Sequence, residues 1–206
     1  MPEIAFLITA FATLFVVIDP PGLVPMFIAL TRGMSAERRR AMAQRACLIA
    51  TALLTLFGLF GESILGFIGI SMPAFRIAGG ILLFLTALDM LFERRTQRRE
   101  GQQADPDHDP SVFPLATPLI AGPGAIATMI LLVGQSGPGW IGTTWVVGLL
   151  LVMMATTFAF LLLSNWFERM LGRTGVIVIT RLLGMLLAAL SVQFVIDGVK
   201  QTGLIG

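Results

Sequence analysis

The sequence predicts an all-α integral membrane protein whose six transmembrane helices form two inverted repeats of three helices. Of its 206 residues, 56% are hydrophobic and only 13% are charged, which lies outside the composition of soluble globular domains. Six apolar segments approach the length of about 20 residues that a helix needs to cross a bilayer. Proline and glycine interrupt the first and the fourth segment, near the middle of each. Helices 1 and 4 are therefore expected to be broken near the membrane midplane.

The expected spans are residues 4–30, 46–66, 72–92, 113–134, 141–164 and 176–199. Together they make a single transmembrane domain, 1–206, with the first repeat at 1–92 and the second at 113–206. The polar residues 93–112 read as a cytoplasmic linker between the repeats.

Basic residues predict the orientation of these spans, because most of the 14 Lys and Arg residues follow odd-numbered spans. The connections after the second and fourth spans carry none. By the positive-inside rule the Arg-rich connections are cytoplasmic, which places both termini in the periplasm. The same clustering accounts for the net charge of +2 without a nucleic-acid partner. The arginines concerned are Arg32, Arg38, Arg39, Arg40 and Arg45 after the first span, Arg94, Arg95, Arg98 and Arg99 after the third, and Arg169 and Arg173 after the fifth.

The first span combines an ionisable residue with a helix break, since Asp19 is followed at once by Pro20, Pro21 and Gly22. A carboxylate at bilayer depth costs roughly 2.5–3.5 kcal/mol on insertion scales, so such a residue is expected to be functional. The plainer alternative is that Asp19 only caps the helix that resumes after the break, where proline is favoured. The sequence leaves both interpretations open.

Gly122, Pro123 and Gly124 form a second break, in the fourth span. If a half-helix resumes at each break, its free N–H groups and positive dipole end favour an anion. A zwitterionic amino acid offers a carboxylate to these groups, and Asp19 is suited to its ammonium group or to a coupled H⁺ or Na⁺. The candidate substrate and ion ligands are Asp19, Pro21, Gly22, Thr117, Gly122, Pro123, Gly124 and Thr128.

Three local matches between the halves indicate a duplicated three-helix unit. Residues 21–22 repeat as 123–124, and Glu62 recurs as Glu168. Arg76 recurs as Arg181, with a glycine three residues later in both copies. Because each unit holds an odd number of spans, the two must enter the membrane from opposite sides.

The same matches define two candidate gating pairs, Glu62 with Arg76 and Glu168 with Arg181. Each pair is expected to bridge its own hairpin, the first at the outer face and the second at the inner face. We hypothesise that the pairs latch alternate states of an alternating-access cycle. The plainer alternative is that the four side chains snorkel to the interface or fix helix packing.

The sequence offers no motif for catalysis, a cofactor or a metal. Cys47 is the single cysteine and is expected to behave as a small buried hydrophobe. The acidic cluster at 105–109 lies in a polar stretch interrupted by proline, where nothing preorganises metal ligands. No histidine lies in a span and no nucleophile–base pair is evident, so an enzyme is not expected.

Two stretches around the breaks together resemble the signature motifs of the MarC family of six-span bacterial inner-membrane proteins. The resemblance extends over essentially the whole chain. It implies an inner-membrane location and a place among neutral amino acid transporters that handle glycine and alanine, within a superfamily of lysine-exporter type. Leu23 stands where the family pattern often has asparagine. The stretches are Asp19-Pro20-Pro21-Gly22-Leu23-Val24-Pro25-Met26-Phe27 and Pro118-Leu119-Ile120-Ala121-Gly122-Pro123-Gly124-Ala125-Ile126.

The function expected from residues and resemblance together is secondary transport of a small solute, such as glycine or alanine, coupled to an H⁺ or Na⁺ gradient. The rival is a membrane scaffold or assembly protein with no transport activity. In that case the broken helices and Asp19 would serve packing alone.

Overall fold

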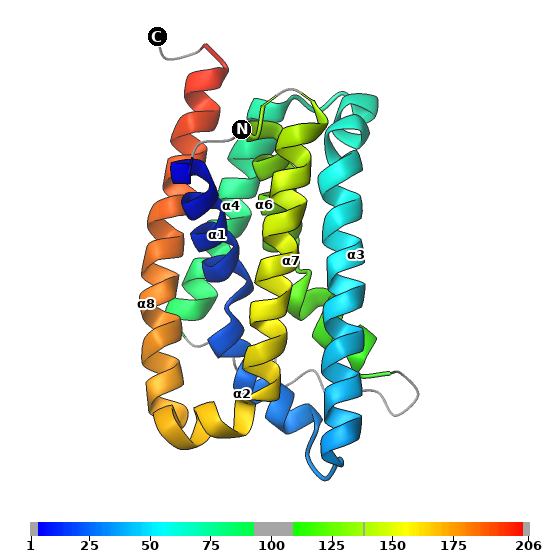
Figure 1. Cartoon of the computed structure of the whole chain (residues 1–206). Coiled ribbons are helices and arrows are strands. Elements are labelled where there is room, and N and C mark those ends of the chain that lie inside the picture. The colour runs from blue at the N-terminus through cyan, green and yellow to red at the C-terminus, as the bar shows by residue number, and fades with distance from the viewer. Residues whose placement is uncertain (1–3, 93–108, 138, 204–206) are drawn as a thin grey trace.

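The computed structural model describes residues 4–92, 109–137 and 139–203, and every regular element in these ranges is helical. Figure 1 shows the helices side by side in one bundle. The elements are α1 (Ile4–Ile18), α2 (Pro20–Leu30), α3 (Ala36–Ile68), α4 (Met72–Leu91), η1 (Ser111–Ile120), α6 (Pro123–Gln135), α7 (Trp140–Leu162) and α8 (Ser164–Gln201).

Five helical stretches are long and apolar enough to cross a membrane, and the bent pair of η1 and α6 makes a sixth if it is one span. This confirms the prediction of an all-helical chain with membrane-length apolar segments. The five stretches are Ile4–Leu30, Ala36–Ile68, Met72–Leu91, Trp140–Leu162 and Thr174–Gln201.

Two helices begin before the predicted apolar spans, in stretches that carry arginine. α3 begins ten residues before the expected span, after Ser35, whose hydroxyl accepts a hydrogen bond from the Arg38 N–H (3.3 Å). This N-cap starts a polar helical stretch that a search for apolar residues overlooks. α8 begins at Ser164 and turns at Gly172 (φ 62°, ψ 175°), a backbone conformation that favours glycine. Its first turns therefore lie across the end of the bundle before the span itself begins (Figure 1).

The α1–α2 pair and α6 each lie between two helices of the other half of the chain. α1 and α2 both pack against α7 and α8, while α6 packs against α3 and α4. Glycines permit the close approach of α6, since Gly61 of α3 faces Ile130 and Gly79 of α4 faces Leu131. α3 and α4 are consecutive in the chain but make few contacts with each other.

α4 and α8 form the most extensive helix pair and run antiparallel. A Cβ atom on Gly80 would lie 2.8 Å from the Ser191 carbonyl oxygen. A Cβ on Gly184 would lie 3.3 Å from the Ala87 carbonyl oxygen. The absence of these side chains lets the two backbones meet.

The start of α1 and the end of α8 lie at the same end of the bundle (Figure 1). The connections from α2 to α3 and from α7 to α8 lie at the opposite end, together with the arginines at the start of α3. We refer to this second end as the Arg-rich end.

Candidate functional site

Asp19 is the single residue between α1 and α2, and its side chain is fully buried. Its backbone is left-handed (φ 54°, ψ 62°), a region that aspartate tolerates better than most residues with a side chain. This geometry lets Oδ1 accept a hydrogen bond from the Gly22 N–H (3.1 Å). The carboxyl group therefore caps α2 deep inside the bundle.

Gly22 lies directly against that carboxyl group. A Cβ atom built on Gly22 would fall 2.6 Å from the Asp19 Cγ atom, which is closer than real Cβ contacts. The position thus needs glycine because the carboxylate occupies the space that a side chain would take.

We expect Gly22→Ala to push the Asp19 carboxyl group off the N-terminus of α2 and so remove the cap. The loss should lower the free energy of unfolding by about 1–2 kcal/mol, the usual effect of losing an N-cap. Thermal unfolding of the purified protein in detergent would measure it. Gly148→Ala is the matched control, because that helical glycine of α7 has open space around it and alanine favours helix. Equal stability of the two variants would contradict the expected displacement.

The second break joins η1 to α6 with a bend of 56°. Within η1, Phe113 (φ −128°, ψ 124°) and Thr117 (φ −128°, ψ 129°) are extended, because a following proline disfavours helical geometry. Gly122 precedes α6 without a side-chain cap, and Pro123 occupies the first turn. Glycine at the N-cap position therefore offers no side-chain acceptor to the N–H groups of that turn.

The two breaks lie next to each other in the interior. A Cβ atom on Gly124 would lie 3.6 Å from Cγ1 of Val17, which is two residues before Asp19. It would also lie 3.1 Å from Leu83 Cδ2 and 3.6 Å from Thr86 Oγ1, both on α4. Asp19, Val17, Gly124 and Leu83 are all buried. Backbone close to both breaks and the Thr86 hydroxyl thus meet between α1, α4 and α6, and Asp19 follows two residues after Val17.

The remaining predicted ligands lie around the breaks with different roles. Thr117 is half-buried and donates its hydroxyl to the Val112 carbonyl (3.2 Å), so it serves its own backbone. Thr128 is fully buried, and its Oγ1 has no hydrogen-bond partner among the described residues. Pro21 is buried in the first turn of α2, whereas Pro123 is exposed.

Thr86 is the site residue that the sequence did not single out. Its hydroxyl donates to the Leu82 carbonyl (2.9 Å), as threonines in apolar helices commonly do. The available signal was its position 105 residues before Ser191, the spacing that also separates Arg76 from Arg181, because Ser191 is polar and fully buried.

The structure does not bring Glu62 and Arg76 together. Glu62 is exposed on α3, while Arg76 is buried in α4 with 7% of its surface exposed, and no ion pair joins them. The reason is the position of α6, which separates α3 from α4, so the expected bridge across this hairpin is not formed. The side chain of Glu168 lies outside the described residues, and Arg181 is exposed on α8.

At the Arg-rich end, Arg39 ties three helices together. Its Nη2 donates to Ser164 Oγ (2.9 Å) and Asn165 Oδ1 (3.1 Å) at the start of α8. Its guanidinium carbon lies 5.6 Å from the centre of the Phe27 ring in α2. These contacts hold α2, α3 and α8 against one another on this side of the two breaks.

Asp109 anchors the start of η1 at the same end. Its Oδ1 accepts hydrogen bonds from the N–H (2.9 Å) and the hydroxyl (2.8 Å) of Ser111, and its Oδ2 lies 3.4 Å from Arg45 Nη1. These bonds to Ser111, with the Arg45 charge, hold the pKa of Asp109 below its usual 3.8. The other residues of the acidic cluster, 105–108, lie outside the described residues, and the described ones form no metal-binding group of three or more His, Cys, Asp or Glu side chains.

We expect Asp109→Asn to lower thermal stability slightly at neutral pH and to have no effect in acid. Because the pKa is lower in the folded chain than in the unfolded one, the carboxylate stabilises the fold above its usual pKa. That contribution is lost as the pH falls through the lower folded value. Unfolding temperatures of both proteins between pH 7 and pH 3 would measure the difference. A difference that stays constant over this range would contradict the prediction.

Comparison with known proteins gives one consistent result. The family model described as "MarC family integral membrane protein" matches residues 4–202. The chain is 37% identical over 202 residues to UPF0056 membrane protein MJ1677 of Methanocaldococcus jannaschii, covering 96% of this chain and 98% of that protein. It is 39% identical to a UPF0056 membrane protein of Archaeoglobus fulgidus (96% and 94% covered) and 37% identical to UPF0056 inner membrane protein YhgN of Escherichia coli K12 (94% and 96%). No solved structure matches the chain.

Proposed function

We propose that this chain, which belongs to the MarC family of integral membrane proteins, is a secondary transporter of a small solute across the bacterial inner membrane. The solute class that the site suits is a neutral amino acid such as glycine or alanine, moved together with H⁺ or Na⁺. The observation that carries the proposal is the meeting of two helix breaks beside the fully buried carboxylate of Asp19. Interrupted helices that meet at membrane depth are a common form of transporter binding site.

The packing of the helices supports two inverted halves. If the two halves are equivalent, α1 and α2 correspond to η1 and α6, α3 corresponds to α7, and α4 corresponds to α8. The contacts of α1 and α2 with α7 then correspond to those of η1 and α6 with α3, and α2 with α8 corresponds to α6 with α4. An odd number of spans in each half requires the opposite orientations that this correspondence implies.

The central pair of helices supports the same symmetry. Gly80 faces the Ser191 carbonyl and Gly184 faces the Ala87 carbonyl, which belong to one antiparallel register. The spacing of 105 residues that takes Arg76 to Arg181 takes Gly79, and not Gly80, to Gly184, so the support comes from the antiparallel pairing of the two helices and not from equivalent glycines. We infer that a pseudo-two-fold axis passes between α4 and α8.

The polar groups around the breaks suit a small zwitterion. The N–H groups in the first turn of α6 lack a side-chain cap and favour a carboxylate. Asp19 supplies the negative charge for an ammonium group or a coupled cation, and Thr86 contributes a hydroxyl. Because Val17, Leu83 and Thr86 already lie within 3.1–3.6 Å of a Cβ on Gly124, a solute can bind beside this glycine only after the helices move apart.

The burial of the site supports a cycle in which the protein opens and closes around the solute. Asp19 has no exposed surface, and the contacts of Arg39 hold the helices together at the Arg-rich end. A solute therefore reaches Asp19 only if helices move, as alternating access requires. We propose that the Arg-rich end is cytoplasmic and that both termini are periplasmic. On this view the protein transports its solute unchanged and has no catalytic role.

The test is uptake of labelled glycine and alanine by liposomes that contain the purified protein, with an inward H⁺ gradient, an inward Na⁺ gradient or neither. We expect flux above protein-free liposomes that rises with one of the two gradients. Counterflow in liposomes preloaded with unlabelled solute would show exchange through the same site. If folded protein moves neither amino acid in any of these assays, the preferred substrate class is wrong. If the protein also fails to transport a broader set of small polar solutes, the alternative of a membrane scaffold without transport activity is favoured.

A further inference from the structure

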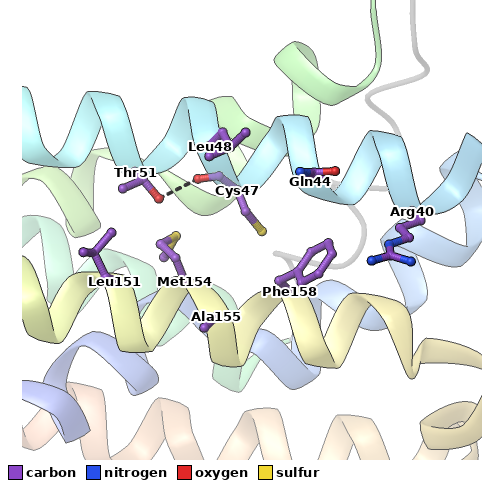
Figure 2. Close-up of a pocket in the computed structure, with 9 residues that line it drawn as sticks. All are labelled: Arg40, Gln44, Cys47, Leu48, Thr51, Leu151, Met154, Ala155 and Phe158. Carbon is purple, nitrogen blue, oxygen red and sulfur yellow. Dashed lines mark hydrogen bonds between the residues drawn. The ribbon is translucent and has the colours of Figure 1, made fainter.

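A groove of about 290 Å³ lies between α3 and α7, apart from the two breaks. Figure 2 shows it running along both helices, with Arg40 at one end and Thr51 and Leu151 at the other. Its lining is Arg40, Gln44, Cys47, Leu48, Thr51, Leu151, Met154, Ala155 and Phe158.

The groove is polar at one end and apolar along the rest of its length. Arg40 and Gln44 are exposed on α3 at the Arg-rich end. Beyond them the surface consists of aliphatic, aromatic and sulfur-containing side chains. The Thr51 hydroxyl donates to the Cys47 carbonyl (2.7 Å), so it does not need a polar occupant. An occupant must therefore combine an apolar chain with a polar or anionic head.

The length of the groove matches one leaflet of a bilayer. Arg40 and Thr51 are eleven residues apart on α3, which corresponds to about 16 Å along the helix. Half of the hydrocarbon core is about 15 Å thick. An acyl chain that passes Phe158 and Met154 thus ends near the bilayer centre while its headgroup stays at Arg40.

The charge at the head position selects the headgroup. In Figure 2 the Arg40 guanidinium lies between α3 and α7, just beyond Phe158. Among the described residues, no carboxylate forms an ion pair with it, so its donors are available to a phosphate. Basic pockets between transmembrane helices are suited to anionic lipid headgroups.

We propose that this groove is a binding site for one anionic phospholipid of the leaflet at the Arg-rich end, with its phosphate on Arg40 and one acyl chain between α3 and α7. Binding there requires only a bilayer and does not depend on the proposed transport. A peptide or a second copy of the chain is the alternative occupant.

The test is native mass spectrometry of the delipidated full-length protein, titrated with phosphatidylglycerol or with phosphatidylcholine of the same acyl chains. We expect one phosphatidylglycerol to bind more tightly than phosphatidylcholine. Arg40→Gln should reduce that preference about five-fold, the effect of one basic residue at a membrane surface. Arg40→Lys should largely retain it.

Two further variants separate the groove from general surface charge. Arg38→Gln removes an exposed arginine of α3 that does not line the groove, and it should leave the preference unchanged. Ala155→Phe fills the exposed, apolar part of the groove and should weaken both lipids.

Three results would overturn the proposal. The first is an equal reduction in Arg38→Gln and Arg40→Gln, which would mean diffuse surface attraction. The second is competition by inorganic phosphate as strong as by the intact lipid, which would mean a free-anion site without an acyl chain. The third is a dimer or bound peptide that Ala155→Phe removes while lipid binding is unaffected.

Discussion

Asp19→Asn is expected to abolish gradient-driven uptake while leaving the protein folded. Asparagine tolerates the left-handed backbone at this position, and its side-chain oxygen can still accept the hydrogen bond from the Gly22 N–H. What disappears is the buried charge that would hold an ammonium group or a coupled cation. Because charge-assisted hydrogen bonds are strong at buried sites, we expect the initial rate to fall about 100-fold, equivalent to about 2.7 kcal/mol.

The measurement is the initial rate of uptake in liposomes with matched amounts of inserted protein. Asp197→Asn is the control, because it removes a carboxylate from α8 whose described hydrogen bond is to Gln193 (2.8 Å), away from both breaks. The unfolding temperature of both variants in detergent should stay close to that of the parent. Uptake at the parental rate in Asp19→Asn would mean that its carboxylate only caps α2.

Gly80→Leu is expected to have the largest effect on folding. The first atom of any side chain at this position would lie 2.8 Å from the Ser191 carbonyl oxygen and 2.8 Å from Val195 Cγ2. Backbone of a packed helix cannot move aside as a side-chain tip does, so α4 and α8 must separate. We expect stability to fall by about 3 kcal/mol or more, at or above the upper end of the range for overpacked cores.

Size-exclusion profiles and thermal unfolding of the detergent-solubilised protein would measure the effect of Gly80→Leu. Gly148→Leu is the matched control, because this exposed glycine of α7 has no neighbouring atom within 4 Å of a Cβ. The control should remain monodisperse with unchanged stability. A well-folded Gly80→Leu protein would show that α4 and α8 do not meet as closely as described.

The sequence was most informative where hydrophobicity alone decides the outcome. Runs of apolar residues identified the membrane-length helices. Proline follows directly after both interruptions of helical geometry, as Pro20 after Asp19 and as Pro123 after Gly122. Hydropathy was less informative at the Arg-rich end, where α3 and α8 begin in polar residues. Helix formation there depends on a cap at Ser35 and on a glycine turn at Gly172, which are properties of single residues.

Contacts between segments that are distant in the chain could not be predicted from the sequence. The expected bridge between Glu62 and Arg76 assumed that helices adjacent in the chain are adjacent in space. The structure instead places α6 between α3 and α4. Likewise, no local pattern marks Thr86, whose place beside Gly124 results from the packing of α4 against α6.

The placement of α1 and α2 against α7 and α8, which are the last helices in the chain, has a consequence for biosynthesis. When synthesis has reached only the end of α6, α1 and α2 have neither α7 nor α8 to cover them. The surfaces of α1 and α2 that pack against α7 and α8 then face lipid or a chaperone until those helices have been inserted. A chain truncated after residue 137 should therefore be degraded rapidly in cells, and a pulse-chase comparison with the full-length chain would measure its lifetime. On this view, membrane quality control distinguishes a completed chain from an unfinished one by whether α1 and α2 have been covered.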